Sequence, residues 1–273
     1  MRRSYLFVPG DSGRKLAKAR QRGADVLILD WEDAVLPENK ARARELSLEF
    51  VLTGSPGDTS VLIRCNPAES SSFEEDCIAL QRIPSEGVLL SKCRSVDEVL
   101  LLDQALCDGE GATEHRIYLM LESPQAVLNA FQMARSCARV AGLMFGAEDF
   151  SAEMHLTRTP EETELLYARS AVATAARAAG CEVVDSPCLE FKDPDRVRSH
   201  AQAARNLGFS GKLAIHPAQV AVINEVFSPS VAEVEWARRI VDAFSAAGAG
   251  VVDLDGTMVD EAIVKQARQI LEG

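Results

Sequence analysis

Short apolar runs alternate with helical patterns eight times along most of this 273-residue chain. Most of the runs are continuously apolar and do not alternate with polar residues, which is typical of parallel strands covered on both faces. Eight strand-then-helix units predict a closed (βα)₈ barrel, also called a TIM barrel. The expected strands are Tyr5–Val8, Val26–Asp30, Val61–Cys65, Gly87–Ser91, Arg116–Leu121, Gly142–Gly146, Glu182–Asp185 and Lys212–Ile215.

The same alternation also fits an open, doubly wound sheet. The chain has no Gly-rich dinucleotide-binding turn, and eight units without one favour the closed barrel. Two helix starts are predicted from the capping-box spacing of Ser95-x-x-Glu98 and Thr159-x-x-Glu162.

The chain continues well beyond the eighth strand. Its further helical patterns are Pro217–Phe227, Val231–Ala247 and roughly Val259–Leu271, with a Gly/Asp stretch from Gly248 to Gly256 before the last one. We therefore expect the barrel to span residues 1–229 and a C-terminal helical extension to span residues 230–273. An extension of this kind serves as a packing appendage, a lid or an arm to a neighbouring subunit.

Composition excludes several classes of function. The 29 basic and 41 acidic side chains give a formal net charge of −12, which argues against nucleic acid as a partner because phosphate backbones need a basic surface. No apolar run reaches the roughly 18 residues of a membrane span, and the first apolar stretch is too short for a signal peptide. The seven cysteines form no CxxC pair, so neither a zinc site nor a disulfide framework is expected. A cytoplasmic enzyme fits these features.

Charged residues collect where the expected strands end. The carboxylates are Asp30, Glu32, Asp33, Glu122, Glu148, Asp149 and Asp185, and the cations are Arg64 and Lys92. In a (βα)₈ barrel these ends surround the mouth where active sites lie. Carboxylates that share a cavity repel one another unless a cation sits among them. Oxygen ligands without a His or Cys cluster indicate Mg²⁺, with Mn²⁺ as an alternative.

The strand-end motifs also carry a family resemblance. They are Tyr5-Leu6-Phe7-Val8-Pro9-Gly10, Leu29-Asp30-Trp31-Glu32-Asp33-Ala34-Val35, Arg64-Cys65-Asn66-Pro67, Leu121-Glu122-Ser123-Pro124, Phe145-Gly146-Ala147-Glu148-Asp149 and Ile215-His216-Pro217-Ala218-Gln219. The chain resembles, nearly end to end, the citrate lyase β-subunit family of the HpcH/HpaI aldolase superfamily, whose relatives include the malyl-CoA and citramalyl-CoA lyases. The resemblance implies a Mg²⁺-dependent (βα)₈ enzyme, commonly trimeric, that cleaves or forms C–C bonds of β-hydroxyacyl thioesters.

The resemblance assigns roles at the mouth residue by residue. It makes Glu122 and Asp149 the metal ligands and Arg64 the clamp for the carboxylate of the oxo acid. It places Glu32 and Asp33 where they hold metal-bound water and Arg64, so we group them with the catalytic residues. From the residues alone, these same side chains could instead form ordinary ion pairs at a barrel mouth.

Other assignments concern the substrate and the oligomer. Arg14 and Lys15 match positions near the phosphates of coenzyme A, although basic helical stretches are usually solvated faces. We place Lys92 among the substrate-binding residues. Asp260, in Met258-Val259-Asp260, matches an aspartate that serves in acid–base chemistry in a neighbouring subunit's site, which implies a homo-oligomer, either a trimer or a hexamer. Its structural alternative is a solvated residue at a helix start.

The chain departs from the family pattern at Ser91, where a proline is usual, at Trp31, where a leucine is common, and at Ser123-Pro124-Gln125. These changes affect the expected shape of the substrate pocket, so the acyl group, its stereochemistry and the direction of reaction stay open.

The expected function is Mg²⁺-dependent cleavage of a malyl-, citramalyl- or citryl-CoA type thioester to acetyl-CoA, or another acyl-CoA, plus a 2-oxo acid. Two alternatives use the same scaffold: a thioesterase, and a β subunit that acts on a carrier-protein thioester within a citrate lyase complex. A Schiff-base aldolase through Lys92 is a fourth candidate. The surrounding carboxylates disfavour it because they raise the pKa of the lysine.

Overall fold

The computed structural model describes residues 2–54, 59–107, 115–247, 250–254 and 256–272. The chain divides into two compact units, Arg2–Asn224 and Glu225–Gly273. No helix among the described residues is both long and apolar enough to span a membrane.

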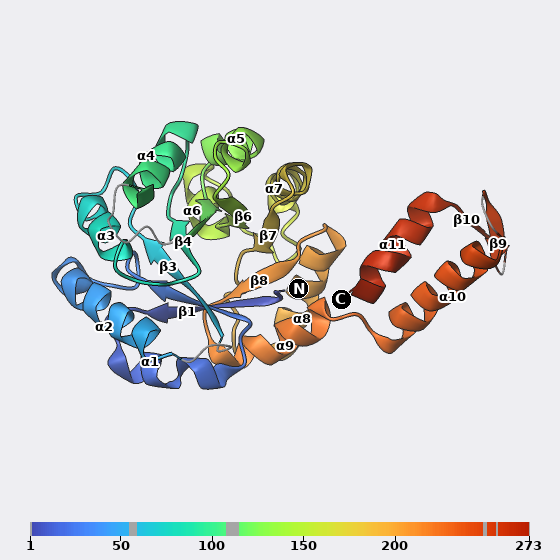
Figure 1. Cartoon of the computed structure of the whole chain (residues 1–273), viewed down its shortest axis with the longest axis horizontal. Helices are drawn as coiled ribbons and strands as arrows, with labels where there is room; N and C mark the ends of the chain where they lie inside the picture. The colour runs from blue at the N-terminus through green and yellow to red at the C-terminus, as the bar shows by residue number, and fades with distance from the viewer. Residues whose placement is uncertain (1, 55–58, 108–114, 248–249, 255, 273) are drawn as a thin grey trace. The chain divides into compact units, whose positions relative to one another are not determined.

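The first unit is a closed barrel of eight parallel strands in the order β1 to β8, with β8 pairing back to β1. Figure 1 shows helices surrounding these strands. The closed barrel confirms the fold predicted from the sequence and excludes the open sheet. The strands are β1 Ser4–Pro9, β2 Val26–Asp30, β3 Ser60–Cys65, β4 Gly87–Leu90, β5 Arg116–Leu121, β6 Val140–Phe145, β7 Glu182–Asp185 and β8 Gly211–Ala214.

The helices that follow the strands are α1 Gly13–Ala19, α2 Lys40–Leu52, α3 Phe73–Leu80, α4 Val96–Cys107, α5 Pro124–Ala134, α6 Ala147–Glu153, α7 Leu166–Ala179, α8 Pro194–Asn206 and α9 Val220–Phe227. Short 3₁₀ segments are η1 Arg20–Arg22, η2 Pro37–Asn39, η3 Thr163–Leu165 and η4 Pro217–Gln219. The α6 helix begins directly after β6 and carries the sequence Ala147-Glu148-Asp149 in its first turn. This short connection keeps the two acidic residues at the mouth of the barrel.

Apolar side chains fill the interior of the barrel. One buried cluster consists of Tyr5, Val26, Ile28, Leu62, Leu89, Tyr118, Met120, Met144, Val184 and Leu213. These residues come from all eight strands, as expected when a barrel is a packed core and not a pore. Polar groups are therefore confined to the two ends of the strands and to the few positions where ion pairs compensate their burial.

One of the two predicted capping boxes is present in modified form. Ser95 Oγ accepts the Glu98 N–H at 3.4 Å, and the Glu98 carboxylate accepts the N–H of Arg94 at 2.8 Å. The α4 helix begins at Val96, next to the predicted start.

The helix start predicted at Thr159-x-x-Glu162 is wrong. Glu162 has a left-handed backbone with φ 54°, and α7 begins only at Leu166. The Thr159 hydroxyl donates to Glu164 Oε2 in η3 at 2.7 Å and does not accept the Glu162 N–H as a capping residue would. The physical reason is tertiary, because Glu162 makes buried ion pairs instead of capping a helix.

The second unit contains two helices and a hairpin. Helix α10 spans Val231–Ala247 and α11 spans Glu261–Glu272, close to the predicted ranges. Between them, β9 Val252–Leu254 pairs with β10 Thr257–Val259 in antiparallel fashion. Residues 248, 249 and 255 of the predicted Gly/Asp stretch lie outside the described residues.

The sequence did not predict this hairpin. Its strands are three residues each, too short for a periodic pattern. The boundary between the units falls within α9, and the role of residues 230–273 as an arm to a neighbouring subunit stays a prediction.

Candidate active site

A cavity of about 450 Å³ opens at the carboxyl ends of the barrel strands. Its charged lining residues are Lys15, Asp30, Asp33, Arg64, Glu122 and Glu148. The structure therefore brings together most of the strand-end charges seen in the sequence. The lining comes from several strands because each βα connection adds one or two polar residues at this end.

Arg64 lies at the centre of the mouth. Its Nε and Nη2 donate to the two carboxylate oxygens of Asp30 at 2.7 and 2.5 Å, and its Nη1 lies 3.1 Å from Glu32 Oε2. The register of β2 and β3 places Asp30 directly opposite Arg64. Burial alone would lower the pKa of Arg64, but Asp30 and Glu32 outweigh it and raise the pKa. The guanidinium therefore stays charged.

Asp30 organises more of the mouth than the sequence indicated. It is 1% exposed, and besides Arg64 it accepts the backbone N–H of Glu32 at 2.9 Å. It thus holds both Arg64 and the turn that carries Glu32 and Asp33. The sequence signal was an acidic residue at the end of an otherwise apolar strand.

Lys92 follows β4 and joins two of the predicted catalytic carboxylates. Its Nζ forms an ion pair with Glu32 and lies 3.1 Å from Asp33 Oδ1. Asp33 therefore pairs with Lys92, whereas the sequence assignment had it hold Arg64. Burial would lower the pKa of Lys92, but these two carboxylates raise it overall. A lysine held in its charged form is a poor nucleophile, which argues against Schiff-base chemistry.

Glu122 is a buried carboxyl group at the end of β5. It is 6% exposed, and its Oε1 accepts the backbone N–H of Lys92 at 2.8 Å. In the described part of the chain no cationic side chain forms an ion pair with it. Burial and the neighbouring Asp149 raise the pKa of Glu122 to about 8. The Lys92 N–H and the charge of Arg64 favour the ionised form, but they offset this rise in pKa only in part.

Asp149 lies in the first turn of α6 and lines, with Glu122, a second hollow of about 210 Å³. None of the residues that the structure describes makes an ion pair or hydrogen bond with its carboxylate. The two carboxylates therefore face one hollow, which Lys92 and Arg94 also line, and among the described residues neither carboxylate forms an ion pair.

The chemistry of this pair fits Mg²⁺. Mg²⁺ sites in enzymes typically use one or two carboxylates and complete their octahedron with water and substrate oxygens. A site built from protein ligands alone is not expected here, since the described residues contain no cluster of three or more His, Cys, Asp or Glu side chains suited to a metal. Glu122 and Asp149 could hold the ion, and its positive charge would offset the repulsion that raises the pKa of Glu122.

Glu148 neighbours Asp149 but has a different environment. Its carboxylate forms an ion pair with Arg158, which also pairs with Glu162. Glu148 therefore has a protein cation, which agrees with the expectation that it is structural and not a metal ligand.

A basic cleft of about 310 Å³ adjoins the mouth. Arg14, Lys15, Lys18 and Arg22 line it from α1 and η1, together with His216. Lys15 also lines the central cavity, so the cleft and the mouth are contiguous. His216 caps η4 by accepting the N–H of Ala218.

Asp260 lies in the second unit. Its Oδ1 accepts the N–H of Ile263 at 3.1 Å and thereby caps α11. This is the helix-start environment that the sequence offered as its structural alternative. The capping contact uses one carboxylate oxygen, so the catalytic role of Asp260 stays a prediction.

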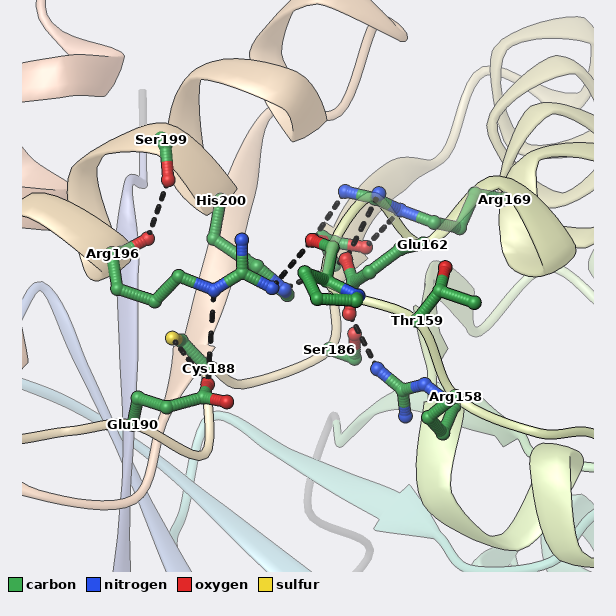
Figure 2. A network of polar contacts seen from close by, with 12 residues as sticks. Arg158, Thr159, Glu162, Arg169, Ser186, Cys188, Glu190, Arg196, Ser199 and His200 are labelled. Carbon is green, nitrogen blue, oxygen red and sulfur yellow. Dashed lines mark hydrogen bonds and ion pairs between the residues drawn. The ribbon is translucent and has the colours of Figure 1, made fainter.

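A second ionic network lies beside the mouth. It contains Asp185, which the sequence grouped with the mouth carboxylates but which is fully buried and does not line the cavity. Lys212, which is fully buried in β8, donates to Asp185 at 2.6 Å, and Arg169 donates to both Asp185 oxygens at 3.0 and 2.9 Å. Figure 2 shows Arg169 and His200 directed toward Glu162, whose Oε2 lies 2.7 Å from His200 Nε2. We call Lys212, Asp185, Arg169, Glu162 and His200 the β7–β8 network. The available signal was Lys212, a charge inside an apolar strand run.

Comparison with known proteins gives consistent matches. Residues 3–217 match the model of the HpcH/HpaI aldolase/citrate lyase family. The chain is 33% identical to the citrate lyase subunit beta of Haemophilus influenzae, over all of this chain and 96% of that protein. It is 34% identical to the (3S)-malyl-CoA thioesterase of Cereibacter sphaeroides, over 98% of this chain and 93% of that one. A crystal structure of CitE from Mycobacterium tuberculosis in complex with magnesium, acetoacetate and coenzyme A matches with a TM-score of 0.85 at 27% identity, covering 99% and 97% of the two chains.

Proposed function

Because this chain belongs to the HpcH/HpaI aldolase/citrate lyase family, we propose that it is a Mg²⁺-dependent carbon–carbon lyase. Its substrate would be a β-hydroxyacyl-CoA thioester of the malyl, citramalyl or citryl type, and its products an acyl-CoA and a 2-oxo acid. The observation that carries the proposal is the pair Glu122 and Asp149, which face one hollow beside the charged Arg64 and form no ion pair with any described side chain. The two cations that line this hollow, Lys92 and Arg94, pair with other carboxylates.

Glu122 and Asp149 would hold the ion. When bound, Mg²⁺ supplies Lewis acidity and a template for substrate oxygens. The two ligands come from β5 and α6, adjacent elements of the barrel, and the magnesium in the related CitE structure supports this cofactor.

Arg64 would bind the carboxylate of the oxo acid. A guanidinium has five N–H groups, and Asp30 and Glu32 engage three of them. The remaining two belong to Nη1 and Nη2, and a planar fork of this kind suits a carboxylate better than an ammonium does. Asp30 would keep the guanidinium in a fixed orientation.

Glu32 and Asp33 would share the positive charges of Arg64 and Lys92 on one side of the cavity. Lys92 would therefore act on the substrate region indirectly, through its ion pairs with these two carboxylates. Proton transfer is assigned to Asp260 of the partner subunit, by analogy with the family motif, and this assignment requires an oligomer. A trimer or a hexamer is proposed on the same ground.

The basic cleft would take the phosphates of coenzyme A. Four cations, Arg14, Lys15, Lys18 and Arg22, gather there in a chain whose net charge is −12. Since its wall at Lys15 is shared with the mouth, a thioester could extend from the cleft to the metal site.

A thioesterase is the second candidate, and the relative named (3S)-malyl-CoA thioesterase specifically favours it. Dependence on a carrier protein is the third, since other relatives are named as the beta subunit of citrate lyase. All three reactions use a thioester beside the same metal site, so their products distinguish them.

The test is an assay of the purified protein with malyl-CoA, citramalyl-CoA and citryl-CoA, with Mg²⁺ and then with excess EDTA. Release of an acyl-CoA and a 2-oxo acid that EDTA abolishes is the expected result. Free coenzyme A with an intact hydroxy acid would replace the lyase by the thioesterase. Turnover only of acyl-carrier-protein thioesters would identify a citrate lyase subunit.

A further inference from the structure

Lys92 has an unusual backbone for its residue type. Its φ is 48°, in the left-handed region that residues other than glycine and asparagine rarely adopt. Among the described residues only His155 and Glu162 share this property without being glycine. Such a conformation persists only where surrounding contacts enforce it, and it concentrates at functional sites.

The contacts that enforce the left-handed backbone of Lys92 are made by its side chain. Lys92 Nζ is held between Glu32, which is 4% exposed, and Asp33. Glu32 is fixed in turn by Arg64. The lysine side chain is therefore tied at its far end to an element 60 residues earlier in the chain.

The strained backbone directs its N–H at the proposed metal ligand. Lys92 N donates to Glu122 Oε1 at 2.8 Å. On the other side, a Cβ placed on Gly146 would lie 2.7 Å from Glu122 Oε2, so the backbone of Gly146 closes off that direction. The Glu122 carboxyl group is thus confined between the Lys92 N–H and Gly146.

We propose that Lys92 is a positioning residue for Glu122, and that its two ends have separable tasks. The left-handed backbone aims the N–H that orients the Glu122 carboxylate toward the metal, and the ammonium anchored on Glu32 and Asp33 keeps the backbone in that conformation. This inference rests on the proposed function, in which Glu122 is a metal ligand.

The proposal makes an unusual prediction about substitutions. Lys92→Ala removes the anchor and keeps the Cβ, so the backbone can relax out of the left-handed region and take its N–H away from Glu122. Lys92→Gly removes the same anchor, but glycine enters this region without steric cost. Glycine should therefore preserve metal binding better than alanine, the reverse of its usual effect on an ordered backbone.

The experiment is titration calorimetry of the full-length protein with Mg²⁺. We expect Lys92→Ala to weaken Mg²⁺ binding about tenfold, which is about 1.4 kcal/mol, and Lys92→Gly to stay within about threefold of the wild type. Arg135→Ala, which removes an exposed cation that lines neither the cavity nor the hollow, is the control and should leave the affinity unchanged. Thermal melts verify that each variant is folded, and Lys92→Gln replaces Lys92→Ala if the alanine variant is not.

Equal affinities for the alanine and glycine variants would overturn the positioning role, whether both match the wild type or both are weakened. A wild-type protein that binds no Mg²⁺ would overturn the metal site of the proposed function itself, and the two failures are therefore distinguishable. A merely structural role for Lys92 would lower the melting temperature of both variants without separating their Mg²⁺ affinities.

Discussion

Two ionic networks belong to the same barrel and differ in charge balance. The mouth network has two cations, Arg64 and Lys92, and five carboxylates, which are Asp30, Glu32, Asp33, Glu122 and Asp149. The β7–β8 network has two cations, Lys212 and Arg169, two carboxylates, Asp185 and Glu162, and the titratable His200. The first is open to a cavity, whereas all the members of the second are buried.

This difference in charge balance indicates that the mouth network is a ligand site and that the β7–β8 network supports the fold. Buried charges are tolerated when each is paired, and the β7–β8 network meets that condition with protein groups alone. The mouth network does not, because Glu122 and Asp149 form no ion pair among the described residues. An excess of carboxylates at a cavity is costly unless a ligand compensates it, so substitutions in the two networks should affect different properties.

The largest effect is expected at the proposed metal ligands. Glu122→Gln or Asp149→Asn should lower kcat/KM by at least about a thousandfold, since each would remove a ligand of the proposed catalytic ion. Stability of the metal-free protein should change by less than about 1 kcal/mol, because neither carboxylate forms an ion pair with a described side chain. Kinetics with Mg²⁺ and urea unfolding without it measure the two properties. Near-normal turnover in both variants would remove the distinction between the networks.

The converse effect is expected at Asp185. Asp185→Asn leaves Lys212 and Arg169 buried with one anion fewer, and breaking a buried pair typically costs about 3–5 kcal/mol. Urea unfolding measures it, and Asp149→Asn is the control because it changes the same chemical group at an exposed position. If the two variants were equally stable, the β7–β8 network would not be a support.

Acid should reveal the same network. Burial alone would raise the pKa of Asp185, but Lys212 and Arg169 lower it overall. Burial alone would likewise raise the pKa of Glu162, but His200 and Arg169 lower it overall. A carboxyl whose folded pKa is depressed contributes stability above its unfolded value, about 4, and loses it as the pH falls through the folded value. The free energy of unfolding should therefore fall as the pH is lowered below about 5, with a smaller slope in Asp185→Asn. Urea unfolding from pH 7 to pH 3 measures it, and parallel slopes would contradict the assignment.

A smaller effect is expected from Gly146→Ala. The added Cβ would meet both Glu122 Cβ and Glu122 Oε2 at 2.7 Å, so the carboxylate must turn and the adjoining backbone must shift. We expect Mg²⁺ affinity to fall about tenfold, or about 1.4 kcal/mol, and stability to fall by about 1–3 kcal/mol through overpacking. Calorimetric titration measures the affinity. Gly13→Ala is the control, since a Cβ there meets no atom within 4 Å.

The smallest effect is expected at an exposed pair near the mouth. Arg94 and Glu153 lie 3.3 Å apart with side chains 42% and 44% exposed. Arg94→Ala should change stability by less than about 0.5 kcal/mol, because solvent screens such pairs. Thermal unfolding measures it, and a loss as large as that of Asp185→Asn would show that burial is not what distinguishes the networks.

Much of the fold follows from local pattern. Each of the eight predicted strands overlaps an observed one, because a parallel strand covered on both faces leaves a continuous apolar run. The helix start predicted at Thr159 was wrong because tertiary contacts, and not the local pattern, determine the structure there. Glu162 has the spacing of a capping residue, but the buried partners Arg169 and His200 determine its position, and no local pattern encodes them.

The sequence by itself determined the barrel and the identity of the charged residues at its mouth, because both depend on where apolar runs begin and end. Tertiary structure decided how those charges are paired. Asp30 holds Arg64 because the β2–β3 register sets them opposite one another, and Lys92 meets Glu32 across 60 residues of chain. Electrostatic energy depends on distance and burial, and the closed barrel fixes both for residues far apart in sequence. Among the described residues it thereby leaves Glu122 and Asp149 without an ion pair.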